Sequence, residues 1–372
     1  MRGQIGRKLE RPDGSGLEWH GIKQGPVTNT LPLAYVTETV GKGKMKMNEF
    51  AGTASISTND LTVTAECRPG ADDNANIDEF FDQFRKTFKL KTSTFKLLDV
   101  LGIKFTENGG RQRYVSIKVR EYMEMTGAKD YKWARKTIEA DLDTLYRMDL
   151  AFKRGKCSLK NARVISEKDI DNGEISIIFS DKFADMLNGD NSFYMDYPDV
   201  LLKTDAQSDD FFVGRKIVEQ VSMNRLQTKY NNDGSPLVVL RDPVAVGVGT
   251  LLEHSPFSPE YDPKKDRHLN GRVIESLEKT LDNLSEAGLF SWEWAGKKNG
   301  DEWQPVTDED FKTYSSFKKL NVLIHPCESW PFRAEKLKAK QRRETNKYNA
   351  RKRAEKKQAD QKAEKELSEK SA

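Results

Sequence analysis

The fold is decided by residues 119–152, which read V-R-E-Y-M-E-M-T-G-A-K-D-Y-K-W-A-R-K-T-I-E-A-D-L-D-T-L-Y-R-M-D-L-A-F. The pattern predicts a short helix, a turn, a longer helix and then a strand. Gly127 ends the first helix, because glycine adopts the left-handed conformation of a helix stop at little cost. Asp130 begins the second helix, since its carboxylate can accept hydrogen bonds from the unpartnered N–H groups of the first turn.

The second helix is amphipathic. Its apolar residues lie four, four and three positions apart and share one face: Ala134, Ile138, Leu142 and Leu145. Lys132, Arg135 and Lys136 point away from this face, in the N-terminal half of the helix. A buried stripe with a basic outer half is typical of the recognition helix of a helix-turn-helix. A helix with merely solvated surface charges gives the same pattern, so one segment alone does not decide between them.

The pattern returns 139 positions later, in D-R-H-L-N-G-R-V-I-E-S-L-E-K-T-L-D-N-L-S-E-A-G-L-F-S-W-E-W, residues 266–294. The apolar positions that correspond to 138, 142, 145 and 150 are Leu277, Leu281, Leu284 and Leu289. The polar N-terminal end of this second helix holds Arg267, His268, Asn270 and Arg272. A repeat of ~140 residues is too long for a solenoid unit, so we expect tandem domains of ordinary size.

The order helix, strand, helix, helix and β-hairpin is that of a winged helix. We therefore predict an α+β protein with two tandem winged-helix domains, at residues 77–203 and 204–332. Residues 1–76, with short apolar runs between Gly, Ser, Thr and Asn, are expected to be a partly disordered N-terminal segment. The hairpin wings are expected to have basic tips, formed by Lys153, Arg154 and Lys156 in the first domain and by Lys297 and Lys298 in the second. Such hairpins either touch DNA or are merely solvated.

Charge is distributed unevenly along the 372 residues. Residues 333–372 contain 15 Lys or Arg and 7 Asp or Glu, so this tail has a net charge of about +8. Because the whole chain has a net charge of +4, the rest of it has about −4. Any DNA binding by the body must therefore come from local patches. The tail has too few apolar residues for a core, so it is either disordered or a solvated helix. It could hold phosphates or only improve solubility.

Several classes of site lack their sequence signatures. Cys67, Cys157 and Cys327 are scattered and odd in number, which suggests neither disulfides nor a zinc cluster. No G-x-x-x-x-G-K-[ST] motif or paired histidines occur, so we expect no ATPase, metal or cofactor. A tyrosine nucleophile has no spacing signature, and a nicking initiator remains an alternative. With no signal peptide or apolar run of membrane length, the protein is expected to be cytoplasmic.

Four stretches resemble plasmid and mobile-element replication initiators of the theta type. They are T-S-T-F-K-L-L-D-V-L-G-I-K-F-T-E (92–107), V-R-E-Y-M-E-M-T-G (119–127), A-R-K-T-I-E-A-D-L-D-T-L (134–145) and F-F-V-G-R-K-I-V-E-Q (211–220). The resemblance covers residues 77–332 and rests on fold-like rather than catalytic motifs. It implies tandem winged helices that bind origin repeats in double-stranded DNA and help to open the origin.

The resemblance also implies partners and an absence of enzymatic activity. Host helicase and other host replication proteins are recruited, and dimers of such proteins often repress their own gene. The first alternative function is that of a transcriptional regulator or copy-number repressor on the same architecture. A further alternative is a structural role, as a partition or scaffold protein. Whether binding melts the origin separates the first two, and the sequence does not settle it.

Overall fold

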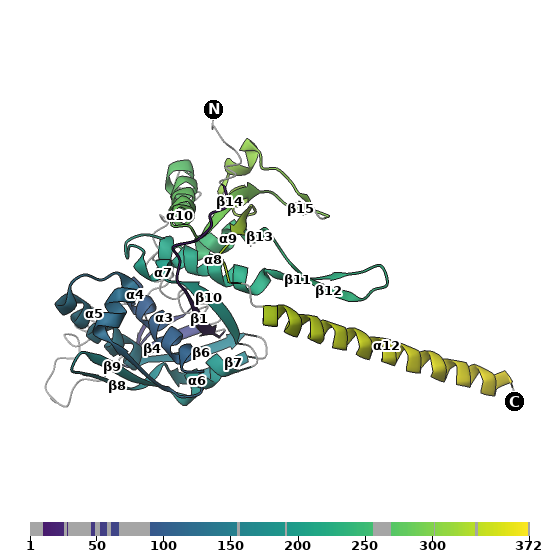
Figure 1. Cartoon of the computed structure of the whole chain (residues 1–372), viewed down its shortest axis with the longest axis horizontal. Helices are drawn as coiled ribbons and strands as arrows, with labels where there is room; N and C mark the ends of the chain where they lie inside the picture. The colour runs from purple at the N-terminus through teal and green to yellow at the C-terminus, as the bar shows by residue number, and fades with distance from the viewer. Residues whose placement is uncertain are drawn as a thin grey trace.

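The computed structural model describes residues 10–25, 28, 46–48, 53–57, 61–66, 90–154, 157–189, 192–255, 269–300, 302–331 and 334–370. Helices and open sheets are mixed along the chain (Figure 1). Two groups of elements repeat the same order, and we refer to them as the first unit and the second unit. Residues 77–89, which begin the predicted first domain, and part of the N-terminal segment lie outside the described residues.

The first unit consists of three helices and a three-stranded antiparallel sheet. Its elements in chain order are α3 (Thr92–Glu107), β5 (Tyr114–Lys118), α4 (Val119–Thr126), α5 (Tyr131–Arg147), β8 (Ile165–Asp171) and β9 (Glu174–Phe179). The strand order is β5-β9-β8, so the last strand lies in the middle. The turn between β8 and β9 has positive φ at Asn172 (49°) and Gly173 (80°), as expected for an Asn-Gly hairpin turn.

The second unit repeats this arrangement. Its elements are α8 (Asp210–Asn224), β13 (Val244–Gly247), α9 (Val248–Glu253), the π-helical turn η1 (Asn270–Ile274) leading into α10 (Glu275–Glu286), β14 (Phe290–Ala295) and β17 (Asn321–Pro326). The strand order is β13-β17-β14, again with the last strand in the middle. The strands β15 (Lys298–Asn299) and β16 (Glu302–Trp303), the 3-10 turn η2 (Asp308–Phe311) and α11 (Tyr314–Phe317) lie between β14 and β17.

The two units also share a backbone contact where the first strand becomes a helix. In the first unit, the N–H of Val119 donates to the carbonyl of Gly173, just before the central strand (2.8 Å). In the second unit, the N–H of Val248 donates to the carbonyl of Leu320, also just before the central strand (3.0 Å). The same register therefore positions both short helices against their sheets.

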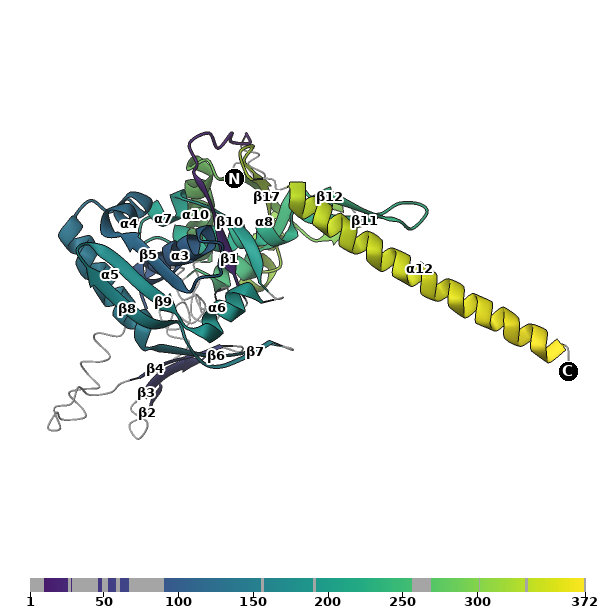
Figure 2. The same ribbon diagram turned by 60° about the horizontal axis from the view of Figure 1, so that its bottom comes forward.

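The strand that follows α5 does not join the three-stranded sheet, which corrects our prediction. β6 (Met148–Arg154) pairs with β7 (Cys157–Arg163) and with β4 (Leu61–Glu66). Together with β2 (Lys46–Asn48) and β3 (Thr53–Ser57), they form the sheet β2-β3-β4-β6-β7, a separate layer in Figure 2. Leu150 and Phe152 of β6 pair with Val63 and Leu61 of β4, and all four side chains are buried. Because of this pairing, β6 is not part of the three-stranded sheet of the first unit. The equivalent of β14 is thus β8.

The N-terminal residues 10–25 connect the two units, and we call them the N-terminal strap. At its start, the carbonyls of Pro12 and Asp13 accept from the N–H groups of Glu328 and Ser329. The strap then forms β1 (Trp19–Gln24), which pairs with β10 (Phe193–Pro198). β1 packs against α3 of the first unit, and β10 packs against α8 of the second. The helices α6 (Asp181–Asn188) and α7 (Val200–Lys203) flank β10 in sequence.

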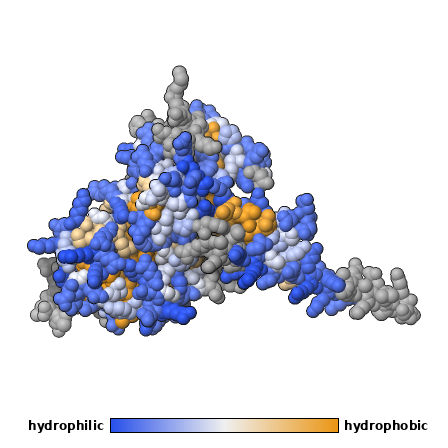
Figure 3. All heavy atoms as spheres, in the orientation of Figure 1, coloured by the Kyte–Doolittle hydropathy of each residue, from blue (hydrophilic) through white to orange (hydrophobic). Residues whose placement is uncertain are grey.

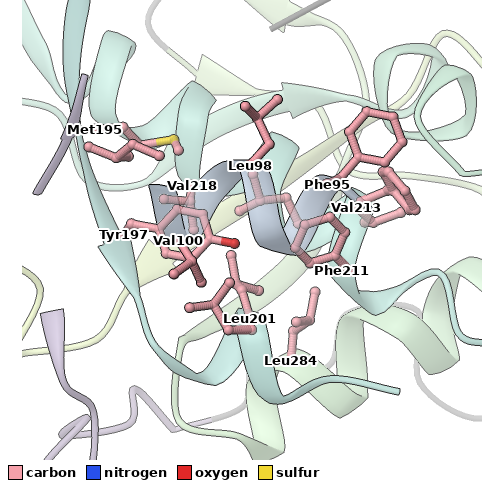
Figure 4. Packing of buried hydrophobic residues seen from close by; sticks show 14 of the residues in the cluster. Phe95, Leu98, Val100, Met195, Tyr197, Leu201, Phe211, Val213, Val218 and Leu284 are labelled. Atoms are coloured by element: carbon pink, nitrogen blue, oxygen red, sulfur yellow. The ribbon is translucent and has the colours of Figure 1, made fainter. Parts of the chain in front are cut away.

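One hydrophobic core runs through both units. Figure 4 shows where they meet, with side chains of α3, β10, α7, α8 and α10 packed together. Phe95 of α3 and Phe212 of α8 have ring centroids 5.5 Å apart. Beside them, the buried guanidinium of Arg215 binds the buried carboxylate of Asp99 through two hydrogen bonds of 2.8 and 3.1 Å. Its Nη2 also donates to Gln24 Oε1 of the strap (3.0 Å).

The tail forms a helix, the second of the two predicted alternatives. α12 (Ala334–Lys370) extends away from the body in both ribbon views (Figures 1 and 2). It packs against the hairpin of β11 (Leu226–Tyr230) and β12 (Pro236–Leu240). The side-chain amide of Gln341 accepts from Val238 N (2.7 Å) and donates to Pro236 O (2.6 Å), much as a neighbouring strand would. None of the described helices combines the length and apolar character needed to cross a membrane.

Candidate nucleic-acid interface

The longest helix of the first unit is built as its sequence predicts. Gly127 follows α4 in the left-handed conformation, with φ 72°. The carboxylate of Asp130 accepts from the N–H of Trp133 (2.7 Å) and so caps α5. The predicted stripe is fully buried, as shown by Ala134, Ile138, Leu142 and Leu145. Burial of this stripe fixes which residues α5 exposes.

The exposed face of α5 carries the predicted basic side chains. Lys132, Arg135 and Lys136 are all exposed. Arg135 Nε lies 3.0 Å from Glu139 Oε1, so Glu139 orients this guanidinium. An exposed i,i+4 pair contributes only about 0.3–0.5 kcal/mol, which a phosphate can readily replace.

The turn between β8 and β9 is acidic. Residues 165–174 contain four carboxylates and one lysine, Lys168, which pairs with Asp143 of α5. The hydroxyl of Tyr131 lies against Gly173, where an added Cβ would be only 2.7 Å from it. This contact anchors the first turn of α5 to the hairpin. Because carboxylates repel phosphates, this hairpin is poorly suited to hold a DNA backbone.

The corresponding helix of the second unit is held by its neighbouring strand. Trp292 Nε1 donates to Asp282 (3.2 Å), and Trp294 Nε1 donates to Glu278 (3.1 Å). Glu278 thus has a structural role. Arg272 is exposed on η1, while only the backbone of Asn270 is described. Arg267 and His268 lie outside the described residues.

Burial confirms the offset of 139 between the two helices. Buried residues occupy matching positions in the pairs Ala134 and Val273, Ile138 and Leu277, Leu142 and Leu281, and Leu145 and Leu284. With the same offset, Trp133 of α5 aligns in sequence with Arg272 of η1. Both side chains are exposed, so the two units present different chemistry at one equivalent position.

The hairpin of the second unit carries two lysines and two carboxylates over residues 297–303, whereas residues 165–174 of the first carry one lysine and four carboxylates. Lys297 and Lys298 are exposed, and Lys298 Nζ lies 5.9 Å from the ring centroid of Trp303. Gly300 has φ 60°, which permits the tight turn between β15 and β16. These lysines lie between β14 and β17, at the place predicted for a wing.

The basic tip predicted for the first domain lies on the five-stranded sheet and not on the hairpin of β8 and β9. Lys153 is exposed near the end of β6, and Arg154 ends that strand. Lys156 lies outside the described residues. The structure therefore places Lys153 and Arg154 on the five-stranded sheet rather than beside β8 and β9.

Sequence reasoning missed Trp133, whose side chain is 60% exposed. It belongs neither to the apolar stripe nor to the cations, so both searches passed over it. Its position next to Ala134, which begins the buried stripe, was the available signal.

Buried ionisable groups outside these helices have structural roles. His254, at the end of α9, has Nδ1 2.9 Å from the carbonyl of Thr250. Burial, together with the charge of Lys216, lowers its pKa to about 3. Within the described ranges, no group of three or more His, Cys, Asp or Glu residues could hold a metal ion.

No protein-family model and no curated protein matches the chain. Two solved structures of RctB are similar to it. A selenomethionine form of domains 2 and 3 of RctB has a TM-score of 0.41 and 9% identity, over 80% of this chain and 98% of that one. A second structure of the same domains has a TM-score of 0.34 and 9% identity, over 77% and 91%. At these values the likeness carries no argument about function.

Proposed function

We propose that the chain is a non-enzymatic replication initiator that binds origin repeats in double-stranded DNA through two winged-helix units. The observation that carries the proposal is the repetition itself. Both units have the same element order, the same strand order and the same hydrogen bond before the short helix. Each exposes the polar face of the helix that follows its short helix, α5 in the first unit and η1 with α10 in the second, which is where helix-turn-helix proteins contact base edges. The resemblance of four sequence stretches to theta-type initiators supports the choice of function.

The connection between the units supports a composite binding site. The ion pair of Arg215 with Asp99 and the shared core restrain the two units as one body. Two DNA-binding units with a fixed separation suit a repeated site of constant length. A flexible linker would instead suit half-sites with variable spacing.

Roles for the candidate residues follow from their chemistry. Arg272 has the geometry to bind a guanine edge with two hydrogen bonds, and Asn270 could do so with adenine. Lys132, Lys136 and Lys298 suit phosphates, which position the protein without specifying sequence. The resemblance adds recruitment of host helicase, a dimer that represses its own gene, and a plasmid-bearing host. We place the action of the protein in the cytoplasm, as expected from the sequence. The sequence has no ATPase motif of its own.

Footprinting on DNA that flanks the protein's own gene, over a salt series, tests this function. We expect protected direct repeats, with protection that weakens steeply as salt rises. A single protected palindrome over the promoter would support a transcriptional repressor instead. An absence of sequence-specific protection would refute both assignments.

A further inference from the structure

Trp133 has an exposure that folding does not explain. Trp133 is 60% exposed, whereas Trp292, Trp294 and Trp330 are at most 8% exposed. Only its backbone N–H takes part in the cap with Asp130, and any residue except proline supplies that group. Among the described residues, its ring has no aromatic or cationic partner. The side chain is therefore available to a ligand.

The surroundings of Trp133 favour a polyanion. Residues 129–139 contain four cationic side chains, namely Lys129, Lys132, Arg135 and Lys136, against two carboxylates. One carboxylate, Asp130, caps the helix, and the other, Glu139, pairs with Arg135. The N-terminal end of a helix adds partial positive charge. An exposed indole within a basic surface is the composition of sites that bind single-stranded nucleic acid.

The geometry of DNA distinguishes two uses of an indole. Paired bases are stacked and present only their edges in the grooves, whereas an unpaired base can expose its ring face. Stacking needs that face. Trp133 thus matches an opened strand better than a closed duplex.

The second unit supplies the contrast. At the position equivalent to Trp133 it has Arg272, which suits a guanine edge or a phosphate, and its hairpin carries Lys297 and Lys298. The first unit combines the indole with an acidic hairpin over residues 165–174. Both units thus offer cations to phosphates, but only the first adds an exposed indole, and only the second places an arginine at that position.

We infer that Trp133 stacks on an unpaired base of opened DNA while the second unit holds the adjacent duplex. This inference rests on the proposed function and assigns different tasks to the two units. It makes Trp133 a contact for the product of origin opening, so that binding favours the opened state.

Full-length protein with Trp133→Ala, Trp133→Phe or Arg272→Ala should be measured against three probes. These are a duplex carrying the footprinted sequence, the same duplex with an adjacent mismatched bubble, and single-stranded oligo(dT). Trp133→Ala should weaken binding to the bubble and oligo(dT) about 5- to 100-fold and change duplex binding less than about twofold. Trp133→Phe should retain most of the affinity. Arg272→Ala should weaken duplex binding.

Fluorescence gives an independent readout. Oligo(dT) should quench the exposed tryptophan emission of the wild type, and Trp133→Phe should abolish most of this quenching. Equal losses on duplex and bubble would make Trp133 a groove contact and overturn the inference, as would wild-type affinity of Trp133→Ala for all probes. In either case duplex binding by the wild type would still support the proposed function. Wild-type protein that binds none of the probes would refute both.

Discussion

The two units share a backbone plan and differ in the surfaces that it presents. Strand order and the hydrogen bonds of Val119 and Val248 are the same in both. Trp133 is exposed on α5 of the first unit, and Arg272 is exposed at the equivalent position, on η1 of the second. Their hairpins also differ, with an acidic turn in one and exposed lysines in the other. The two units share their backbone arrangement but differ in their exposed side chains, which indicates that they have different functions.

Additions outside the units differ as well. The first carries the five-stranded sheet, and the second carries the β11–β12 hairpin on which α12 packs. Near the base of this hairpin, the space-filling view shows an apolar patch (Figure 3). Met223, Leu237 and Leu240 in this region are 42–51% exposed.

The largest expected effect comes from breaking the connection between the units. Arg215→Ala leaves the carboxylate of Asp99 buried without its partner, so it should lower the free energy of unfolding by about 3–5 kcal/mol. Denaturant unfolding followed by circular dichroism measures it. Arg351→Ala is the matched control, because Arg351 pairs with Glu355 at 3.0 Å on the exposed surface, and it should change stability by less than about 0.5 kcal/mol. A loss below about 1 kcal/mol for Arg215→Ala would contradict the restraint that we assign to this pair.

The ends of the two short helices should respond differently to pH. Gly127 follows α4, whereas His254 follows α9 and has its pKa lowered to about 3 by burial. Below its unfolded pKa of about 6.5, the unfolded state binds a proton that the folded state does not, so stability falls as pH falls from about 6.5 towards 3. Between pH 7 and pH 5 this group alone should cost about 2 kcal/mol.

Unfolding of the wild type and His254→Asn at both pH values isolates this contribution. The variant should lose about 2 kcal/mol less than the wild type between pH 7 and pH 5. Between pH 7 and pH 8 both proteins should behave alike, because the histidine is neutral in both states. Equal losses at pH 5 would show that His254 is protonated in the folded protein.

Base reading should be confined to the second unit. Arg272→Ala should cost about 1–3 kcal/mol of DNA-binding free energy and relax specificity at one base pair. Lys132→Ala is the comparison, and it should weaken binding to all sequences uniformly. Binding to the footprinted site and to single-base variants of it measures both effects. A uniform loss for Arg272→Ala would make it a phosphate contact.

The smallest effect is expected in the tail. Residues 334–357 of α12 contain 11 Lys or Arg and 3 Asp or Glu, whereas residues 358–372 contain 3 and 4. If the basic part touches DNA, replacing Arg351, Lys352 and Arg353 with Gln should flatten the slope of log K against log salt by about one unit for each lost phosphate contact. Deletion of 358–372 should leave the slope unchanged. An unchanged slope in the triple variant would leave the tail with no role in DNA binding.

Local signals predicted much of the fold. The buried stripe of α5, its cap at Asp130 and the stop at Gly127 all follow from residues within a few positions of one another. Long-range pairing could not be predicted. β6 pairs with β4, which lies more than 80 residues earlier in the sequence. β1 of the strap pairs with β10, and these two strands are separated by even more residues. The sequence of a strand specifies which of its faces is buried but not which distant strand it pairs with.

The same division applies to the candidate interface. Exposure of Lys132, Arg135 and Lys136 followed from the stripe that they avoid. Trp133 did not, because a tryptophan in an amphipathic helix is usually assigned to the core. The structure shows that Trp133 points outward, since it is exposed while its neighbour Ala134 is buried.

The most direct test of the account is permanganate reactivity of thymines on supercoiled DNA that carries the protein's own gene and its flanks. We predict that full-length protein protects direct repeats and makes thymines beside them reactive, because binding stabilises an opened strand. Protected DNA with no reactive thymines would contradict an initiator and leave a repressor that binds closed duplex.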